Sequence, residues 1–182
     1  MKKIFPFLLF AILACFNLNA EERVIKLNKL FQDLKLNNPE LTFEVEQKIW
    51  EIWSKHPKNE NLTIMLSEGT NLVNNNQLNE AVTVFSKVIE LDPSWAEAWN
   101  KRATVLYLLG EFQKSQDDID KVLELEDRHF GALAGQGLVN IQLKNYEKAI
   151  LSYKKAKKIY PSMKSPEIMI KEIEEIIKRQ SI

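Results

Sequence analysis

Two histidines and one cysteine are the side chains of this 182-residue chain best suited to metal or nucleophilic chemistry. His56 and His129 lie far apart in the sequence, and neither has a second His or a Cys at the spacing that holds zinc on a helix. His129 follows Arg128 where a helix is expected to begin, and there a capping or packing role is commoner than catalysis. We therefore predict no metal site, no cofactor and no catalytic residue.

Motifs of other enzyme classes are also missing from the sequence. It contains no Gly-rich phosphate loop, no nucleophile elbow and no pair of carboxylates in a recognisable catalytic pattern. Lys plus Arg equals Asp plus Glu, at 25 each, so no strong basic field favours nucleic acid. The sequence therefore gives no reason to expect an enzyme or a protein that binds nucleic acid.

Residues 1–20 have the pattern of a secretory signal peptide. Lys2 and Lys3 form a positive start, and the apolar run over residues 5–16 is too short for a typical membrane span. Ala20 ends a cleavage-site pattern. We predict cleavage after Ala20, export to the periplasm of a Gram-negative bacterium, and no membrane span afterwards. An uncleaved anchor is the alternative.

Cys15 gives a second reading of the same segment. Cleavage after Ala20 would remove this cysteine and leave a mature chain without thiol or disulfide chemistry. The stretch Ile12-Leu13-Ala14-Cys15 also resembles a bacterial lipobox, in which Cys15 becomes the lipid-modified first residue. In that alternative an acyl anchor tethers the same domain to a membrane.

An internal repeat with a period of 34 residues organises the rest of the chain. Within one unit the apolar positions have helical spacing, and polar or Gly-containing turns separate the helices at residues 74–76, at 110 and at 144–145. Apolar, small and proline positions keep register: Leu78, Phe112 and Tyr146; Val88, Val122 and Ala156; Leu91, Leu125 and Ile159; and, at twice the period, Gly69 and Gly137, Ala81 and Ala149, Phe85 and Tyr153, Pro93 and Pro161.

A helix-turn-helix unit of this length resembles the tetratricopeptide repeat (TPR) family. Laid on the family pattern, the repeats run over residues 62–95, 96–129 and 130–163. The second is the weakest match, with Ser115 for the usual Ala and Asp127 for the usual Pro. Small residues are needed where the two helices of a unit cross closely. The resemblance implies an all-α solenoid of three helix pairs.

Further helices flank the three repeats. Residues 21–61 predict an N-terminal helical pair, a degenerate repeat or cap at that end of the stack, with Asn38-Pro39 opening its second helix. Residues 164–182 predict a C-terminal capping helix that begins at Ser165-Pro166. After Asp92-Pro93, the pair Ser94 and Glu97 predicts a capping box.

The mature chain also resembles a narrower group, the exported TPR proteins of alphaproteobacteria. Three stretches carry this likeness: residues 49–53, 96–104 and 128–133. That group has no assigned biochemical role, so the likeness implies compartment and architecture and leaves the ligand open.

The family resemblance implies a concave groove lined by the first helix of each repeat. Transferred by register, the groove would be mostly apolar, with Asn100 as its central polar residue. The Lys/Asn/Arg set that clamps a peptide carboxylate in some relatives is largely missing, so we expect an apolar peptide or amphipathic helix. Alternatively, the flanking helices partly fill the groove. The predicted lining is Leu66, Thr70, Val73, Asn100, Thr104, Tyr107, Leu138 and Ile141.

Register also places Arg102 and Asp118 on facing helices of the second repeat, where an ion pair would brace it. Pairs of this kind occur in the family. Trp53 and Trp99 fall at core spacing, whereas Trp95 directly follows Ser94 and is expected to be partly exposed.

These features predict an exported scaffold or adaptor that binds a partner peptide or helix in its concave groove. An envelope assembly factor or chaperone with many clients, lipid-anchored at Cys15, is the alternative. A structural subunit that self-associates is a third reading, because the sequence leaves the oligomeric state open.

Overall fold

The computed structural model describes residues 21–180. The predicted signal peptide, with Ala20 and Cys15, lies outside the described residues, so the cleavage and the lipidation remain predictions. Between residues 21 and 180 the chain is helical, with short connections and no strand.

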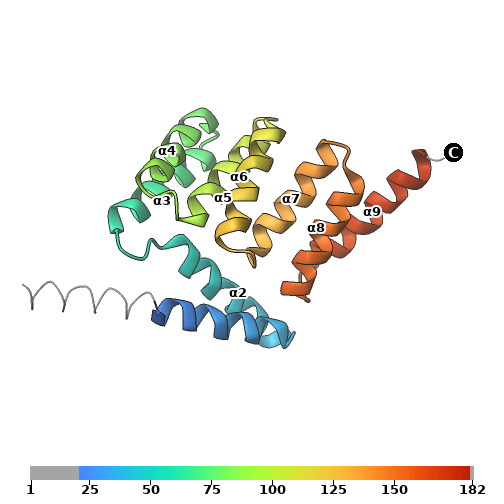
Figure 1. Ribbon diagram of the computed structural model, residues 1–182, viewed down its shortest axis with the longest axis horizontal. Coiled ribbons are helices and arrows are strands. Elements are labelled where there is room, and N and C mark those ends of the chain that lie inside the picture. Colours follow the sequence, from blue (N-terminus) through green and yellow to red (C-terminus); the bar gives the residue numbers. More distant parts are fainter. Residues whose placement is uncertain (1–20, 181–182) are drawn as a thin grey trace, which may run out of the picture.

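Three antiparallel helix pairs stack side by side in an α-solenoid, as the repeat predicts (Figure 1). An N-terminal pair precedes them, and its first helix covers residues 21–35. The other elements are α2 (Pro39–Ser54), α3 (Glu60–Asn74), α4 (Leu78–Leu91), α5 (Ala96–Leu108), α6 (Phe112–Leu125), α7 (Phe130–Gln142), α8 (Tyr146–Ile159) and α9 (Ser165–Gln180). The repeats are α3–α4, α5–α6 and α7–α8, and α9 packs on α8 at the C-terminal end.

The turn inside each repeat has the same backbone conformation. Asn76, Gly110 and Lys144, spaced by one period, have φ of 59°, 79° and 59°. Such left-handed residues end a helix because they redirect the chain, and Gly or Asn adopts them at least cost. The three polar breaks in the sequence are therefore one structural feature repeated three times.

Small residues allow the two helices of a repeat to cross closely. A Cβ added to Gly69 would overlap the ring of Phe85, and one added to Gly137 would lie 2.5 Å from the ring of Tyr153. In the second repeat the corresponding position is Ala103, opposite the smaller Ile119. The predicted reason for small residues is confirmed, and the alanine is tolerated because its partner is not aromatic.

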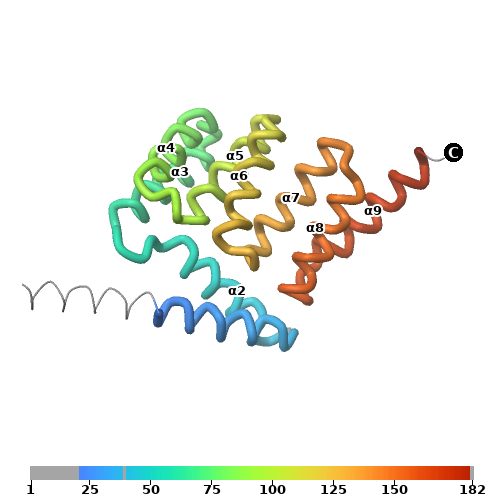
Figure 2. Tube along the Cα trace, viewed as in Figure 1, coloured from blue at the N-terminus to red at the C-terminus, as the bar shows by residue number. Residues whose placement is uncertain are grey.

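We expected the N-terminal pair to cap the stack beside α3, and this prediction is wrong. The pair lies across the ends of the repeats where one unit connects to the next (Figures 1 and 2). Its apolar residues, among them Leu34, Ile49 and Trp53, form one core with Phe130 of α7 and Tyr160 after α8. A helical pair with one apolar face can bury it against any apolar edge, so periodicity alone could not give its position.

Polar contacts hold the N-terminal pair at several repeats. The indole nitrogen of Trp95 donates to the Trp53 carbonyl at 2.9 Å, and the Tyr160 hydroxyl donates to Glu46 at 2.8 Å. Burial, together with the carboxylate of Glu46, raises the pKa of Tyr160 to about 12. Arg128 donates to Asn28 at 2.7 Å and lies over the ring of Phe31.

Two local predictions around residue 95 are wrong. Trp95 is only 5% exposed, because it packs against His56 and bonds to the N-terminal pair. Ser94 is not the N-cap of α5: its hydroxyl donates to Asp92, and Trp95 occupies the N-cap position without a side-chain hydrogen bond to the first turn of the helix. Glu97 is buried and engaged elsewhere, so no capping box forms. By contrast, Asn38 caps α2 as predicted.

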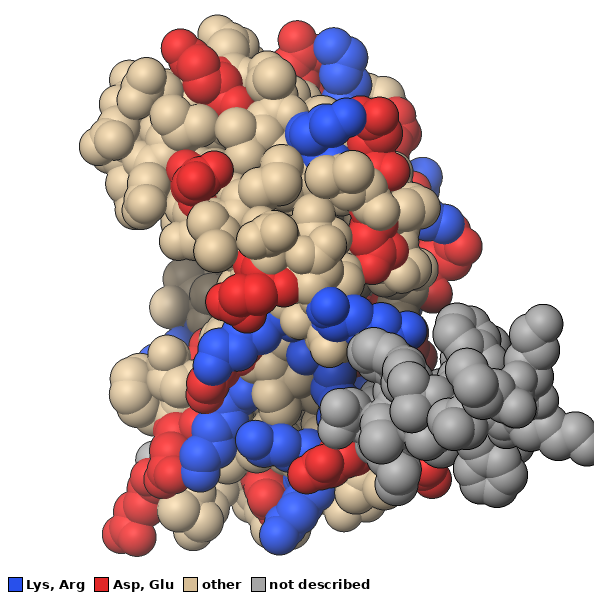
Figure 3. Space-filling view, turned by 90° about the vertical axis from the view of Figure 1, so that its left-hand side faces the viewer, with Lys and Arg blue, Asp and Glu red and all other residues tan. Residues whose placement is uncertain are grey.

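Charged side chains of both signs mix on the face shown in Figure 3, with Lys and Arg gathered toward its lower part. Within the described residues, no helix is long and apolar enough to cross a membrane. No group of three or more His, Cys, Asp or Glu residues there could hold a metal ion.

Candidate functional site

A shallow groove between α5 and α7 is the part of the concave surface that matches the sequence prediction. Its floor contains Ala103, Gly131 and Gly135, and it encloses about 80 Å³. Four predicted residues line it: Asn100, Thr104, Tyr107 and Leu138. The small floor residues keep the space between the two helices open, while the four side chains form its walls.

The other four predicted residues lie elsewhere. Leu66 is 3% exposed and packs in the core that α3 and α4 share with Ala98 and Val105 of α5, so its assignment to the groove is wrong. Thr70 is half-buried and donates its hydroxyl to the Leu66 carbonyl. Val73 packs against the same core. Adjacent residues of an α-helix point about 100° apart, so a shift of one residue moves a side chain from the groove to the contact with the next repeat. The family register alone does not distinguish these two faces.

The N-terminal pair closes one end of this groove. The indole of Trp50 lies where a Cβ of Gly131 would be, at 2.5 Å, so α2 occupies the end near the repeat junction. At the C-terminal side, Ile141 packs against the core that α9 forms through Ile173, which explains why this predicted residue does not reach the groove. The flanking helix α2 therefore occupies one end of the groove, whereas α9 packs on α7 and α8 away from the residues that line it.

His129 lies at the centre of the contact between α2 and the repeats. The imidazole is fully buried, stacks on Trp53 with ring centroids 4.0 Å apart, and bonds to Glu97 through Nε2 at 3.1 Å. Its Nδ1 accepts the backbone N–H of Ala132 and so caps α7, as the capping interpretation predicted. The bonds to two helices and the stacking give this histidine a structural role.

Glu97 is the buried partner of His129. Burial alone would raise the pKa of this carboxyl, but the hydrogen bond from His129 and nearby positive charge lower it below its usual value. Asn100 donates to the same carboxylate at 3.0 Å, and Lys101 lies 3.3 Å from its other oxygen. Asn100 thus joins the groove wall to this buried cluster.

His56 makes a second contact of the same kind. Its Nδ1 accepts the backbone N–H groups of Lys58 and Asn59, and its Nε2 lies 2.7 Å from Asp92. The ring meets Trp95 edge to face. Burial alone would raise the pKa of Asp92, but hydrogen bonds from Ser94 and His56 lower it. Both histidines of the chain therefore fix the N-terminal segment to the repeats.

The predicted ion pair of the second repeat is present. Arg102 donates through Nε and Nη2 to the two oxygens of Asp118, each at 2.7 Å, and through Nη1 to Ser86 at 3.0 Å. Ser86 belongs to the preceding repeat, so Arg102 connects two units as well as bracing its own.

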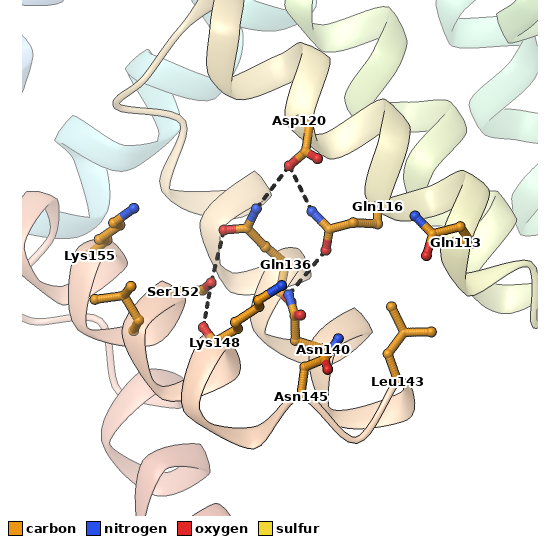
Figure 4. A pocket seen from close by; sticks show the side chains of 11 residues that line it. Gln113, Gln116, Asp120, Gln136, Asn140, Leu143, Asn145, Lys148, Ser152 and Lys155 are labelled. Atoms are coloured by element: carbon orange, nitrogen blue, oxygen red, sulfur yellow. Dashed lines mark hydrogen bonds between the residues drawn. The ribbon is translucent and has the colours of Figure 1, made fainter.

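A second, larger cleft lies on the opposite side of α7 from the groove, between α6 and α8 (Figure 4). We call it the polar cleft. It encloses about 490 Å³. None of the residues that line it is among those we assigned to the groove from the family pattern. Sequence reasoning missed it because its members are amides and lysines spread over three helices. They are Gln113, Gln116, Asp120, Gln136, Asn140, Leu143, Asn145, Lys148, Leu151, Ser152 and Lys155.

Comparison with known proteins settles the family. A TPR repeat family model matches residues 69–110, and a tetratricopeptide repeat model matches residues 109–164. The chain belongs to the tetratricopeptide repeat family. The matched residues cover α4 to α8 together with the end of α3, and so include most of the three stacked helix pairs.

Relatives of this TPR protein differ in length. A TPR repeat-containing protein of Rhizobium etli is 28% identical over 138 residues, which are 75% of this chain and 67% of the relative. Hsp70-Hsp90 organizing protein 1 of Glycine max is 26% identical over 95 residues, which are 52% of this chain and only 17% of that protein. The chain thus spans a small part of the second relative.

A solved structure supports the fold of the stack. The first TPR of Spaghetti (RPAP3), bound to the HSP90 peptide SRMEEVD, is similar with a TM-score of 0.63 at 17% identity. The match covers 64% of this chain and 93% of that one. At this identity the likeness shows a shared architecture of TPR helix pairs.

Proposed function

We propose that this TPR protein is an exported scaffold that binds one segment of a partner protein in the groove between α5 and α7. The observation that carries the proposal is the open floor at Ala103 and Gly135 beneath the walls. A groove with small residues at its floor and larger side chains at its rim suits the insertion of apolar side chains from a peptide or helix.

The chemistry of the walls supports an apolar ligand. Leu138 is 37% exposed, and Tyr107 offers an aromatic face beside it. Asn100 donates to Glu97, which leaves its carbonyl oxygen to accept a hydrogen bond from a ligand. Burial of apolar side chains would supply most of the binding free energy, and Asn100 would fix the orientation.

The relatives support a role in protein binding. One similar TPR domain holds an HSP90 peptide. For this chain, the mostly apolar groove favours an internal segment of the partner over a free C-terminus.

Photo-crosslinking in the native cell envelope tests the proposal. A photoreactive residue is placed at Thr104 on the groove wall and, as a matched control, at Lys87 on α4, which is exposed and outside the groove. We expect one or two proteins to crosslink at position 104 and not at 87. The double substitution Asn100→Ala with Tyr107→Ala should abolish these adducts.

The other outcomes point to different functions. Many adducts at position 104 would favour an assembly factor or chaperone with many clients. The same adducts with and without the double substitution would show that the groove is not the binding site. Adducts between two copies of this chain would favour a self-associating structural subunit.

The exported location is a separate part of the proposal, and it rests on the sequence of residues 1–20. The intact mass of the protein purified from its native envelope tests it. A chain that starts at Glu21 supports a free periplasmic protein, whereas a lipid-modified chain that starts at Cys15 supports a membrane-tethered one. A full-length chain in the cytoplasmic fraction would contradict export.

A further inference from the structure

The polar cleft has a rigid floor made by one hydrogen-bond network. Asp120 accepts from the amides of Gln116 at 2.8 Å and Gln136 at 3.2 Å (Figure 4). Asn140 donates to Gln116 at 3.1 Å, and the hydroxyl of Ser152 donates to Gln136 at 2.9 Å. Because each floor side chain is held by another, the shape of the cleft is set before any ligand arrives.

The same network exists one repeat earlier with charged residues. Gln136, Asp120 and Ser152 correspond by one period to Arg102, Ser86 and Asp118. At the earlier junction the arginine and the aspartate neutralise each other. At the junction beneath the polar cleft, Gln136 and Ser152 are neutral, and the single acid, Asp120, is satisfied by two amide donors.

Several polar groups at the rim of the cleft have no side-chain partner among residues 21–180. Lys148 and Lys155 form no ion pair with any residue from 21 to 180. The side chain of Asn145 makes no cap bond to α8, and within the described part of the chain nothing donates to Asn140 Oδ1. The rim therefore combines two uncompensated positive charges with free amide donors and acceptors.

We infer that the polar cleft binds an extended acidic segment of a protein, with two carboxylates three residues apart. Lys148 and Lys155 lie seven residues apart on one helix, which corresponds to about 10.5 Å along its axis. An extended chain advances about 3.3 Å per residue, so carboxylates at positions i and i+3 match the two lysines. Asp120 lies on the opposite wall, on α6, where two neutral amides bond to its carboxylate, so the three charged residues of the lining sum to a net charge of +1.

The free amides favour an extended segment over a helix. A strand-like peptide exposes backbone N–H and C=O groups. Asn140 can accept an N–H through its Oδ1, and Asn145 can both accept and donate. A helix has satisfied these groups internally and would leave the amides unpaired. Leu143 and Leu151 in the lining provide apolar contact for the side chains between the two acids.

Nuclear magnetic resonance titration with a defined peptide tests this inference. The probe is an acetylated and amidated octapeptide of Gly, Ser and Thr with glutamate at its third and sixth positions. Its counterpart carries glutamine at both. We expect the glutamate peptide to shift the side-chain amide signals of Asn140 and Asn145 in a saturable manner at millimolar concentration. The glutamine peptide should bind about tenfold more weakly.

A matched pair of variants separates the cleft from general charge attraction. Lys148→Glu with Lys155→Glu should weaken binding of the glutamate peptide about tenfold or more. Lys154→Glu with Lys158→Glu changes the charge of α8 by the same amount at exposed positions outside the cleft, and should leave binding within about twofold.

Three outcomes would overturn the inference. These are the absence of saturable shifts, equal loss in both variant pairs, and equal shifts with free glutamate at the same carboxylate concentration. The result is independent of the proposed function. Asn100→Ala with Tyr107→Ala changes the groove and the bond from Asn100 to Glu97, neither of which belongs to the polar cleft, and should leave these shifts unchanged.

Discussion

Arg102 illustrates how one side chain holds two repeats together. Its guanidinium uses three nitrogens, bonding to Asp118 in its own repeat and to Ser86 in the preceding one. The carbon of the guanidinium also lies 5.0 Å from the ring centroid of Trp99. Asp118 is only 6% exposed in its side chain, so the carboxylate depends on Arg102 for compensation of its charge.

Removal of the arginine should therefore destabilise the fold. We expect Arg102→Ala to lower the free energy of unfolding by about 2–3 kcal/mol, because it leaves a buried carboxylate without its bidentate partner. This corresponds to a decrease in Tm of about 4–12 °C for a chain of this size. Thermal unfolding followed by circular dichroism measures the change.

The surface pair Lys87 and Glu90 provides the control for this prediction. Both side chains are more than half exposed, so Lys87→Ala should change stability by less than about 0.5 kcal/mol. Equal Tm values for the Arg102→Ala variant and the unsubstituted protein would show that the ion pair does not brace the repeat.

Single residues were predictable where the repeat places two partners on facing helices, as it does for Arg102 and Asp118. They were not predictable where burial depends on a segment outside the repeat. Trp95 is buried because the N-terminal pair covers it, and its spacing in the sequence contains no information about that cover. The assignment of Leu66 to the groove was wrong for a related reason, because the neighbouring helix α5 covers this side chain.

Helices α7 and α8 show how glycine sets the distance within a repeat. Gly137 faces the ring of Tyr153. At Gly135, two residues earlier on α7, an added Cβ would meet Ile119 Cδ1 at 3.7 Å. An added methyl group would overlap an aromatic ring at the first position and make an ordinary contact at the second.

These two glycines should respond in opposite directions to alanine. Gly137→Ala should lower the free energy of unfolding by about 1–3 kcal/mol, because the buried ring of Tyr153 must move or the helices must separate. Gly135→Ala should raise it by about 0.5–1 kcal/mol, because alanine restricts the unfolded chain and favours the helix. Urea unfolding of both variants gives the comparison.

The second repeat suggests how the clash can be relieved. It combines Ala103 with Ile119 at the positions of Gly137 and Tyr153. In a protein that carries Tyr153→Ile, Gly137→Ala should lower the free energy of unfolding by less than it does beside tyrosine. The double variant should therefore be more stable than the sum of the two single effects predicts. Additive effects would mean that the ring is not the obstacle.

At the level of elements, the sequence predicted the helices and their pairing because the 34-residue register repeats both the apolar stripe and the turns. The helix boundaries and the left-handed turn residues agree with that pattern. The position of the N-terminal pair was not predictable, since an amphipathic pair has no register with the repeats. The polar cleft was missed for a similar reason: its residues become neighbours only when α6, α7 and α8 are stacked.

The N-terminal pair contacts several repeats at the junctions between them. Residues 21–54 contact Trp95 beside α5, Phe130 of α7 and Tyr160 after α8. The solenoid alone joins only neighbouring repeats, and such stacks unfold unit by unit more readily than globular domains. A segment that touches several units should make unfolding more cooperative, and the buried bond between Glu97 and His129 lies at the centre of this contact.

The pH dependence of stability tests that buried bond. The folded-state pKa of Glu97 is lowered from its usual value, so the ionised carboxylate stabilises the fold above about pH 4.5. That contribution is lost as the pH falls below this value and through the folded pKa. Glu97→Gln removes the charge at every pH. We expect this variant to lose about 1.5–3 kcal/mol of unfolding free energy at pH 7, since the bond involves a charged group.

The difference between the two proteins should then shrink as the solution is acidified, because protonation removes the charge from the unsubstituted protein as well. Urea unfolding at intervals from pH 7 to about 3, followed by tryptophan fluorescence, measures both curves, and Trp53 stacked on His129 reports directly on the site. Glu124→Gln, on an exposed pair with Lys121, should show no such pH-dependent difference. A gap between wild type and Glu97→Gln that stays constant over this range would mean that the carboxylate acts through packing, and that its charge does not secure the N-terminal pair.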